Sequence, residues 1–382
     1  MTPLTVEEFE RALYTGHGRA ALHLKAHGAA GREALLVEAC LHTRCYDREV
    51  EGSRAEWMAL LIELTGHEGL YRTRILEALA HATDYRSVRQ GLELALVWAR
   101  RGHQDAKRVL YDVWGRVCVE RFGTDVAAVF PRFETVADDD LARRMDEVLE
   151  EEQPVARSVP PQPERTLDNA ERMIEDRTKD PWGGWLSSFG TRMTSQEADV
   201  SFARLLAETN AERLVQRLSV FRVRGFPSLT PRIWQLAESA DPVIQSAALQ
   251  ALARTNHADV GRFARRLLSK EPSAATKGAI ALLAQQYEPA DHVLLESLLS
   301  VPRNEQDIHS VGSDLVDVGQ DTAGPELAPC LLWVYEQTPC SLCRAKSVER
   351  LVERKAAPRH VLEECLWDSV ADTRQLARAI VG

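Results

Sequence analysis

The sequence predicts an all-α protein with two helical lobes, and three observations support this prediction. Apolar residues recur every three or four positions along nearly the whole chain, without the alternation that is typical of a strand. Glycines stand just after several helical segments, where helices commonly end. A helix-pair pattern returns in the C-terminal half. A content of 45% hydrophobic and 27% charged residues is typical of a folded domain and argues against a disordered chain.

The N-terminal lobe is expected over residues 1–152 and begins with a capping box. In Thr5-Val6-Glu7-Glu8, the threonine hydroxyl and the Glu8 carboxylate can accept hydrogen bonds from the free N–H groups at the start of a first helix. Further helical segments follow at residues 18–28, 32–47, 50–66, 68–84, 84–102 and 103–123. Glycines that fit the left-handed position after a helix are Gly28, Gly66, Gly102 and Gly123. The short connections predict antiparallel neighbouring helices.

A proline-rich linker is expected at residues 153–166. It contains four prolines and no apolar period, so we predict an extended segment between the lobes, after a last acidic helix at residues 138–152. A second irregular stretch, residues 180–190, is different because it contains Trp182, Trp185 and Phe189. We expect these aromatic side chains to pin the stretch to the body of the protein, and we keep the two tryptophans as a candidate binding surface.

The C-terminal lobe, residues 167–382, contains an internal repeat. The segment DPVIQSAALQALA at 241–253 aligns without gaps to four later segments, and its first core position returns after 30, 34, 35 and 30 residues. These first core positions are Ile244, Ala274, Ile308, Cys343 and Thr373. Apolar partner helices lie between the segments. Because one such helix pair cannot bury its own apolar face, we expect the pairs to stack into a solenoid.

These segments resemble HEAT-type (armadillo-like) repeats, whose second helix opens with Asp-Pro-x-Val-Arg-x-x-Ala. Asp241-Pro242-Val243-Ile244-Gln245 matches this opening except that Gln245 replaces the usual arginine. Arg344 and Arg374 do occupy the arginine position. The resemblance covers about residues 196–382 and implies a HEAT-like αα superhelix in which the Asp and Arg positions bond neighbouring repeats. It leaves the function open, because such repeats serve scaffolds, transport factors, a few enzymes and DNA-binding proteins.

Charge and cysteine content suggest a cytoplasmic protein, and the high arginine content suggests a bacterial one. The net charge is −10, no apolar stretch approaches the ~18 residues that span a bilayer, and MTPLTVEEFE has no apolar signal region. Seven cysteines in a chain of this length are expected to be reduced thiols. Nucleotide-binding, zinc-protease and serine-hydrolase motifs are absent. We therefore expect no cofactor and a non-catalytic role, although an enzyme without a local motif stays open.

Two groups of residues could hold a metal. Cys340-Ser341-Leu342-Cys343 could be a redox pair or half of a zinc site, but Cys343 occupies a core position of the repeat. His23 and His27 share one face of a helix, and Cys40, His42 and Cys45 follow within 20 residues. We expect structural roles for both groups and keep metal binding as an alternative.

A basic stretch at residues 72–116 carries nine basic and five acidic side chains. Its candidate contacts for a polyanion are Arg86, Arg89, Arg100, Arg101, Lys107 and Arg108. A stripe of this kind could neutralise phosphates, as HEAT-like DNA glycosylases do. We favour solvated or ion-paired arginines instead, because the chain as a whole is acidic.

The expected function is therefore a non-catalytic scaffold or adaptor that binds a protein partner through the concave surface of a solenoid. The alternative is a nucleic-acid-binding HEAT-like protein, such as a DNA-repair glycosylase-like enzyme. A third interpretation is a protein similar to the bilin lyase-type HEAT proteins, in which the groove holds a small molecule.

Overall fold

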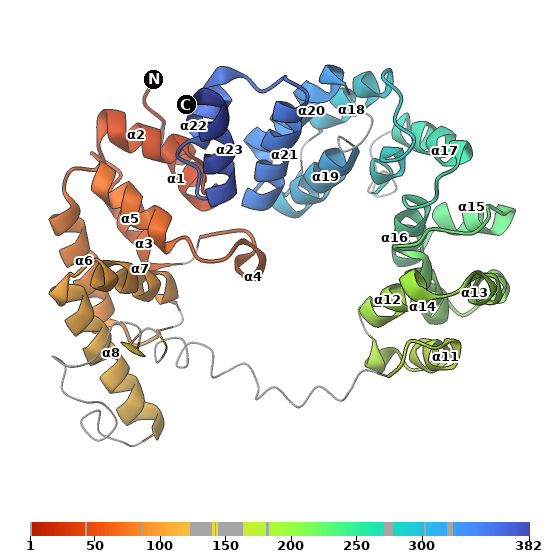
Figure 1. Cartoon of the computed structure of the whole chain (residues 1–382), viewed down its shortest axis with the longest axis horizontal. Helices are drawn as coiled ribbons and strands as arrows, with labels where there is room; N and C mark the ends of the chain where they lie inside the picture. Colours follow the sequence, from red (N-terminus) through yellow and green to blue (C-terminus); the bar gives the residue numbers. More distant parts are fainter. Residues whose placement is uncertain are drawn as a thin grey trace. The chain divides into compact units, whose positions relative to one another are not determined.

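The computed structural model describes residues 2–42, 44–85, 87–122, 140–141, 143, 163–180, 183–270, 278–301, 303–318 and 324–382 (Figure 1). All regular structure within these ranges is helical, which confirms the predicted all-α class. None of the helices there has the length and the apolar character that a membrane span requires. The predicted linker lies outside the described residues up to position 162.

The chain forms two compact units. The first contains Met1–Pro160, Pro339–Ala345 and Pro358–Gly382, and the second contains Pro161–Thr338 and Lys346–Ala357. This division differs from the predicted lobes, because the last helix pair belongs with the N-terminal helices. The buried polar contacts described below account for that difference.

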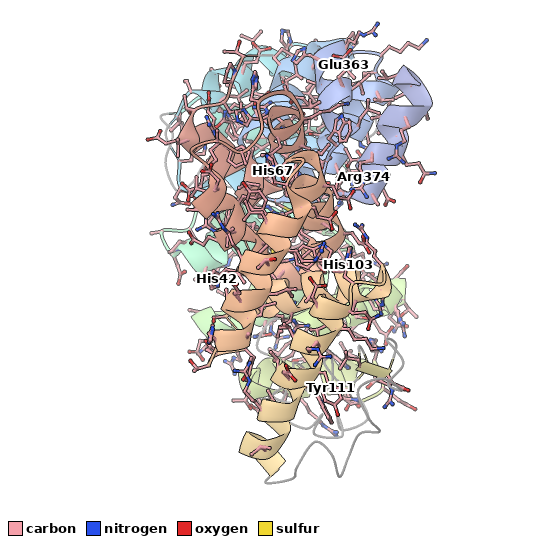
Figure 2. All side chains as sticks on the ribbon, turned by 90° about the vertical axis from the view of Figure 1, so that its left-hand side faces the viewer. His42, His67, His103, Tyr111, Glu363 and Arg374 are labelled. Atoms are coloured by element: carbon pink, nitrogen blue, oxygen red, sulfur yellow. The ribbon has the colours of Figure 1, made fainter. Side chains whose placement is uncertain are left out.

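The first unit is built from helices. They are α1 (Val6–Thr15), α2 (Arg19–His27), α3 (Glu33–Leu41), α4 (Arg48–Glu51), α5 (Ala55–Leu64), α6 (Glu68–His81), α7 (Arg89–Arg100), α8 (Gln104–Phe122), α22 (Arg359–Cys365) and α23 (Ala371–Val381). The predicted capping box is present, because the Thr5 hydroxyl accepts from the Glu8 N–H at 3.2 Å and the Glu8 carboxylate accepts from the Thr5 N–H at 2.8 Å. Figure 2 shows the side chains of this unit, with His67 ahead of α6 and His103 ahead of α8.

Helix α7 is the core of the first unit. It packs against α3, α5, α6 and α8, and its apolar residues from Leu92 to Ala99 are buried, with Trp98 fully enclosed. Gly91 allows a close approach here, since a Cβ at this position would lie 3.0–3.3 Å from atoms of Leu79 and Leu41. The broad apolar face that the sequence predicts for this segment is therefore the central layer of the unit.

A buried arginine joins the two ends of the chain within the first unit. Helix α21 (Ser341–Glu353) starts in this unit, and Arg344 in its first turn is fully buried. The Arg344 guanidinium donates to the Asp368 carboxylate at 2.9 Å and to the main-chain oxygens of Thr15 and Gly16 at 2.7 and 3.1 Å. The Ser369 N–H also donates to Gly16 O at 2.9 Å. Helices α22 and α23 therefore lie beside α1 (Figure 1).

The second unit consists of helices arranged in two layers. They are α11 (Leu167–Glu175), α12 (Gly184–Arg192), α13 (Ser195–Ala207), α14 (Ala211–Phe221), α15 (Pro231–Ala237), α16 (Pro242–Leu252), α17 (Ala258–Leu268), α18 (Asp291–Leu299), α19 (Glu305–Val318) and α20 (Ala328–Gln337), with the 3-10 turns η2 (Arg177–Lys179), η4 (Ala281–Leu283) and η5 (Pro325–Leu327). Along one layer α14 contacts α16, α16 contacts η4, and η4 contacts α19. Along the other, α17 contacts α18 and α18 contacts α20.

Most of the predicted core positions of the repeat that the structure describes are buried. Ile244, Ala248 and Leu252 on α16 are buried, as are Gly312 and Val316 on α19. Ile308 is half-buried. Ala274 lies outside the described residues.

Polar side chains at the opening of the repeat segments form hydrogen bonds to the main chain. Asp241 caps α16, because its carboxylate accepts from the Val243 N–H at 2.9 Å. Gln245 donates to Ala237 O at 3.3 Å, and Arg374 donates to Asp368 O at 2.6 Å, in each case toward the turn inside its own helix pair. Of Gln245, Arg344 and Arg374, which share the arginine position of the repeat, only Arg344 reaches the following helix pair.

Asp314 on α19 gives a prediction about pH. Burial, together with the negative charge of Asp317, raises the pKa of Asp314 from the usual 3.8 to about 7. The folded protein therefore holds this proton over a pH range in which the unfolded chain has lost it, so stability falls as the pH rises from about 4 to 7. The Asp314→Asn variant has a neutral side chain at every pH in this range. We expect it to have a higher Tm than the wild type at pH 8 and nearly the same Tm at pH 4.

Thermal unfolding followed by circular dichroism tests this expectation. Asp112→Asn, at an exposed position on α8, is the matched control for the loss of one negative charge. A lower Tm for Asp314→Asn than for wild type at pH 8 would show that the surroundings of Asp314 do not raise the pKa of its carboxyl in the folded protein.

Candidate functional site

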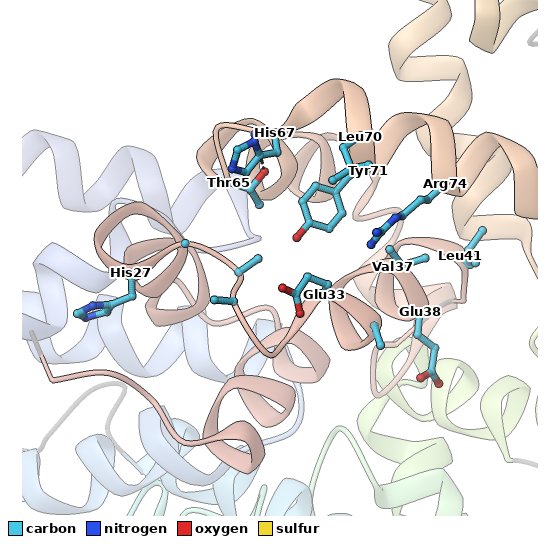
Figure 3. A pocket seen from close by; sticks show the side chains of 14 residues that line it. His27, Glu33, Val37, Glu38, Leu41, Thr65, His67, Leu70, Tyr71 and Arg74 are labelled. Carbon is cyan, nitrogen blue, oxygen red and sulfur yellow. Dashed lines mark hydrogen bonds between the residues drawn. The ribbon is translucent and has the colours of Figure 1, made fainter.

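An open groove of about 940 Å³ runs along α3 and α6 of the first unit (Figure 3). Its lining residues are His27, Gly28, Ala29, Ala30, Glu33, Ala34, Val37, Glu38, Leu41, Thr65, His67, Leu70, Tyr71 and Arg74. We refer to it below as the α3–α6 groove. A volume of this size falls in the range of sites that bind small molecules or segments of a protein partner.

The wall of the groove is apolar and made mostly of small side chains. Gly28 and Gly31 have φ of 70° and 73°, which lets the chain turn sharply from α2 into α3. This turn places Ala30 and Ala34 on the wall, both exposed. Leu70, in the first turn of α6, is 52% exposed. The groove thus leaves apolar surface open to water that a ligand could cover.

Three polar groups face this apolar wall. The ring of Tyr71 is buried, while its hydroxyl and the Arg74 guanidinium point into the space between α3 and α6 (Figure 3). Glu33 lies in the first turn of α3, where main-chain N–H groups and the Arg74 charge lower the pKa of its carboxyl. Burial and the Glu33 charge raise the pKa of Tyr71. At neutral pH the groove therefore offers a carboxylate, a neutral phenol and a guanidinium.

Some arginines of the predicted basic stretch form ion pairs with glutamates. Arg89 contacts Glu93 at 3.0 Å on α7, and Arg101 contacts Glu56 at 3.0 Å and also Glu63. Arg100 ends α7, and Lys107 and Arg108 lie on α8, so the fold brings their helices together. Arg86 lies outside the described residues. The pairs of Arg89 and Arg101 match the ion-paired interpretation, because a neutralised arginine has less to offer a phosphate.

The aromatic stretch of the second unit is described in part. Trp185 on α12 is 7% exposed, its Nε1–H donates to Pro163 O at 3.2 Å, and its ring stacks on Phe189. It belongs to the core of that unit, which differs from its expected place on a binding surface and agrees with the pinning role. Trp182 lies outside the described residues.

The Cys340–Cys343 pair lies in the first unit at the start of α21. Both thiols are buried and reduced. A hydrogen bond from Cys343, opposed by burial, lowers the pKa of Cys340 to about 6. The Ser341 N–H between them donates to the Glu51 carboxylate at 3.0 Å. The pair therefore combines a reactive thiol, in the sense of its lowered pKa, with restricted access to solvent.

Two residues of the predicted histidine site, His23 and Cys40, have packing roles. His23 is buried, its Nδ1 accepts from the Leu4 N–H at 3.1 Å, and burial lowers its pKa. Cys40 is fully buried, which raises the pKa of its thiol. Within the described ranges, His23, His27, Cys40 and Cys45 do not bring three ligand atoms within 4.8 Å of one another.

The groove residues were not singled out by the sequence, apart from His27. The available signal was Leu70, which stands outside the buried series of Tyr71, Ile75 and Leu79 on the same helix. An apolar residue off the buried face of a helix is weak evidence by itself. Neither a protein-family model nor a curated protein matches the chain.

Proposed function

We propose that this protein is a non-catalytic helical-repeat scaffold or adaptor, and that a segment of a protein partner docks in the α3–α6 groove. The observation that carries the proposal is the open groove of about 940 Å³, with its exposed leucine, small side chains and charges of both signs. A partner segment with apolar side chains would cover Leu70 and Val37, and its charged groups would meet Glu33 and Arg74.

The helix layers of the second unit support the repeat part of this proposal. Contacts run from α14 through α16 and η4 to α19 in one layer and from α17 through α18 to α20 in the other, as stacked HEAT-like pairs would require. In such a solenoid the second helices line the concave surface, which would give the partner a further extended contact. The reduced thiols fit the cytoplasmic location that the proposal assumes.

A protein partner fits the charges of the groove better than a nucleic acid does. The groove contains Glu33 and Glu38, whose carboxylates would repel phosphates. The Arg89 and Arg101 side chains are already held by glutamates. The net charge of −10 opposes a polyanion further. Nucleic-acid binding is therefore the competing outcome of the experiment below.

Replacing Leu70 by aspartate should abolish capture of the partner. The change puts a negative charge on the wall of the groove that Glu33 also lines. An apolar partner segment would lose its contact with Leu70 and would have to desolvate the new carboxylate. We expect the amount of specifically captured protein to fall about tenfold or more. The measurement is affinity capture from cells of the native organism, with quantitative mass spectrometry of the bound proteins.

Val119→Asp is the matched control. Val119 is 55% exposed on α8, close to the 52% of Leu70, and it does not line the groove. The proposal requires proteins that wild type and Val119→Asp retain and Leu70→Asp loses. Equal capture by all three would contradict the groove assignment. Bound nucleic acid that disappears in high salt would favour the alternative function instead.

A further inference from the structure

A second pocket of the first unit, of about 460 Å³, lies between α5 and the last helix pair. Its lining residues are Glu56, Trp57, Leu60, Leu366, Trp367, Arg374 and Arg378, none of which lines the α3–α6 groove. Figure 2 shows Arg374 on the C-terminal helices next to the N-terminal helices of the same unit. We call this cavity the tryptophan pocket.

The floor of the tryptophan pocket is aromatic and rigid. Trp57 is 3% exposed, and its Nε1–H donates to Trp367 O at 2.8 Å, which ties α5 to the end of α22. The Trp367 indole is half-buried, and the Lys25 ammonium lies 4.7 Å from its ring centre. Such a preformed apolar wall binds flat apolar groups with little loss of entropy.

Two arginines one helical turn apart form the other side. Arg374 and Arg378 both lie on α23, and like charges at this spacing repel each other. Arg374 donates to the main-chain oxygens of Asp368 and Ser369 at 2.6 and 2.9 Å, whereas the Asp368 carboxylate is bound by Arg344. Burial lowers the pKa of Arg374, an effect that Asp368 opposes and Arg378 increases. An anion between the two guanidinium groups would remove their repulsion.

Glu56, the acidic residue that lines the pocket, does not form an ion pair with either arginine in the structure. The Glu56 carboxylate is 73% exposed and accepts from Arg101 at 3.0 Å. In the part of the chain that the structure describes, Arg378 has no carboxylate within ion-pair distance. The pocket therefore combines an aromatic floor with the exposed guanidinium of Arg378, which no described carboxylate pairs.

We propose that the tryptophan pocket binds a small molecule in which a flat apolar ring is joined to an anionic group. The ring would lie against Trp367, Leu366 and Leu60, and the anion, a carboxylate or a phosphate, would be held by Arg378 and Arg374. The guanidinium fork suits both anions. This site is independent of the α3–α6 groove.

Isothermal titration calorimetry of the full chain with matched probes tests the proposal. Indole-3-acetate and adenosine monophosphate each carry a ring and an anion, indole and adenosine lack the anion, and acetate and inorganic phosphate lack the ring. We expect at least one ring-bearing anion to bind with a 1:1 ratio and a Kd below about 1 mM. The arm that binds identifies the anion. Its neutral counterpart and its ringless counterpart should each bind about tenfold more weakly or worse.

Arg378→Gln should weaken binding about tenfold to a hundredfold, because it removes a charged donor. Arg378→Lys keeps the charge without the fork and should bind with intermediate affinity. Arg359→Gln is the control, since Arg359 is 84% exposed on α22 and lies outside the pocket. The proposal is overturned if neither ring-bearing anion binds, if the neutral or ringless probes bind equally well, or if folded Arg378→Gln binds like wild type.

Discussion

Replacing Arg344 by leucine should lower the free energy of unfolding by about 3–5 kcal/mol. The Asp368 carboxylate, which is 1% exposed, would keep its charge in the interior without its cation. The main-chain oxygens of Thr15 and Gly16 would lose their donors at the same time. Because these contacts join α21 and α22–α23 to α1, we expect the first unit to unfold at a markedly lower urea concentration.

Urea unfolding followed by far-UV circular dichroism measures this effect. Arg359→Leu is the control, because this side chain is 84% exposed and pairs with Glu363 at the surface. It should change the free energy by less than about 0.5 kcal/mol. A loss of less than about 1 kcal/mol for Arg344→Leu would mean that the buried pair with Asp368 does not form in solution.

Leu252→Asp is expected to be similarly severe in the second unit. Leu252 is fully buried at the end of α16, which packs against α14, α15 and η4. An aspartate there would bury a carboxylate that has no cation, at a cost of about 4 kcal/mol or more. We expect a lower Tm and loss of helical signal at temperatures where the wild type is folded.

Gln250→Asp gives the comparison on the same helix. Gln250 is exposed, so the same new charge stays in water and should cost only about 0.5–1 kcal/mol near the helix end. Equal melting of wild type and Leu252→Asp would show that the repeat register derived from the core positions is incorrect.

Local features of the fold could be predicted from the sequence. The Thr5–Glu8 capping box and the buried series Ile244, Ala248 and Leu252 follow from short spacings, because helix caps and helix faces depend on residues three and four positions apart. The resemblance to HEAT-type repeats implies that an arginine at this position bonds the neighbouring helix pair, and Arg344 does donate to the Asp368 carboxylate.

Contacts between residues far apart in the chain could not be predicted from the sequence. Arg344 and Thr15 are 329 residues apart, and nothing in either segment indicates the other as its partner. The last helix pair was therefore assigned by continuity of the repeat to the C-terminal lobe, whereas packing places it in the first unit. The groove and the tryptophan pocket depend on the same kind of information, since a cavity exists only once separate helices are placed side by side. Exposed Leu70 becomes a candidate contact residue only once the fold shows that it lines the same groove as Glu33 and Arg74.

Site-specific photo-crosslinking tests most directly whether a protein partner occupies the α3–α6 groove. A benzophenone amino acid is placed at position 70 in one variant and at position 119, outside the groove, in another, and both are irradiated in native cell extract. The proposed function predicts a discrete protein adduct from position 70 that survives nuclease treatment and is absent from position 119. Adducts of equal pattern from both positions, no adduct from position 70, or an adduct that nuclease removes would contradict it.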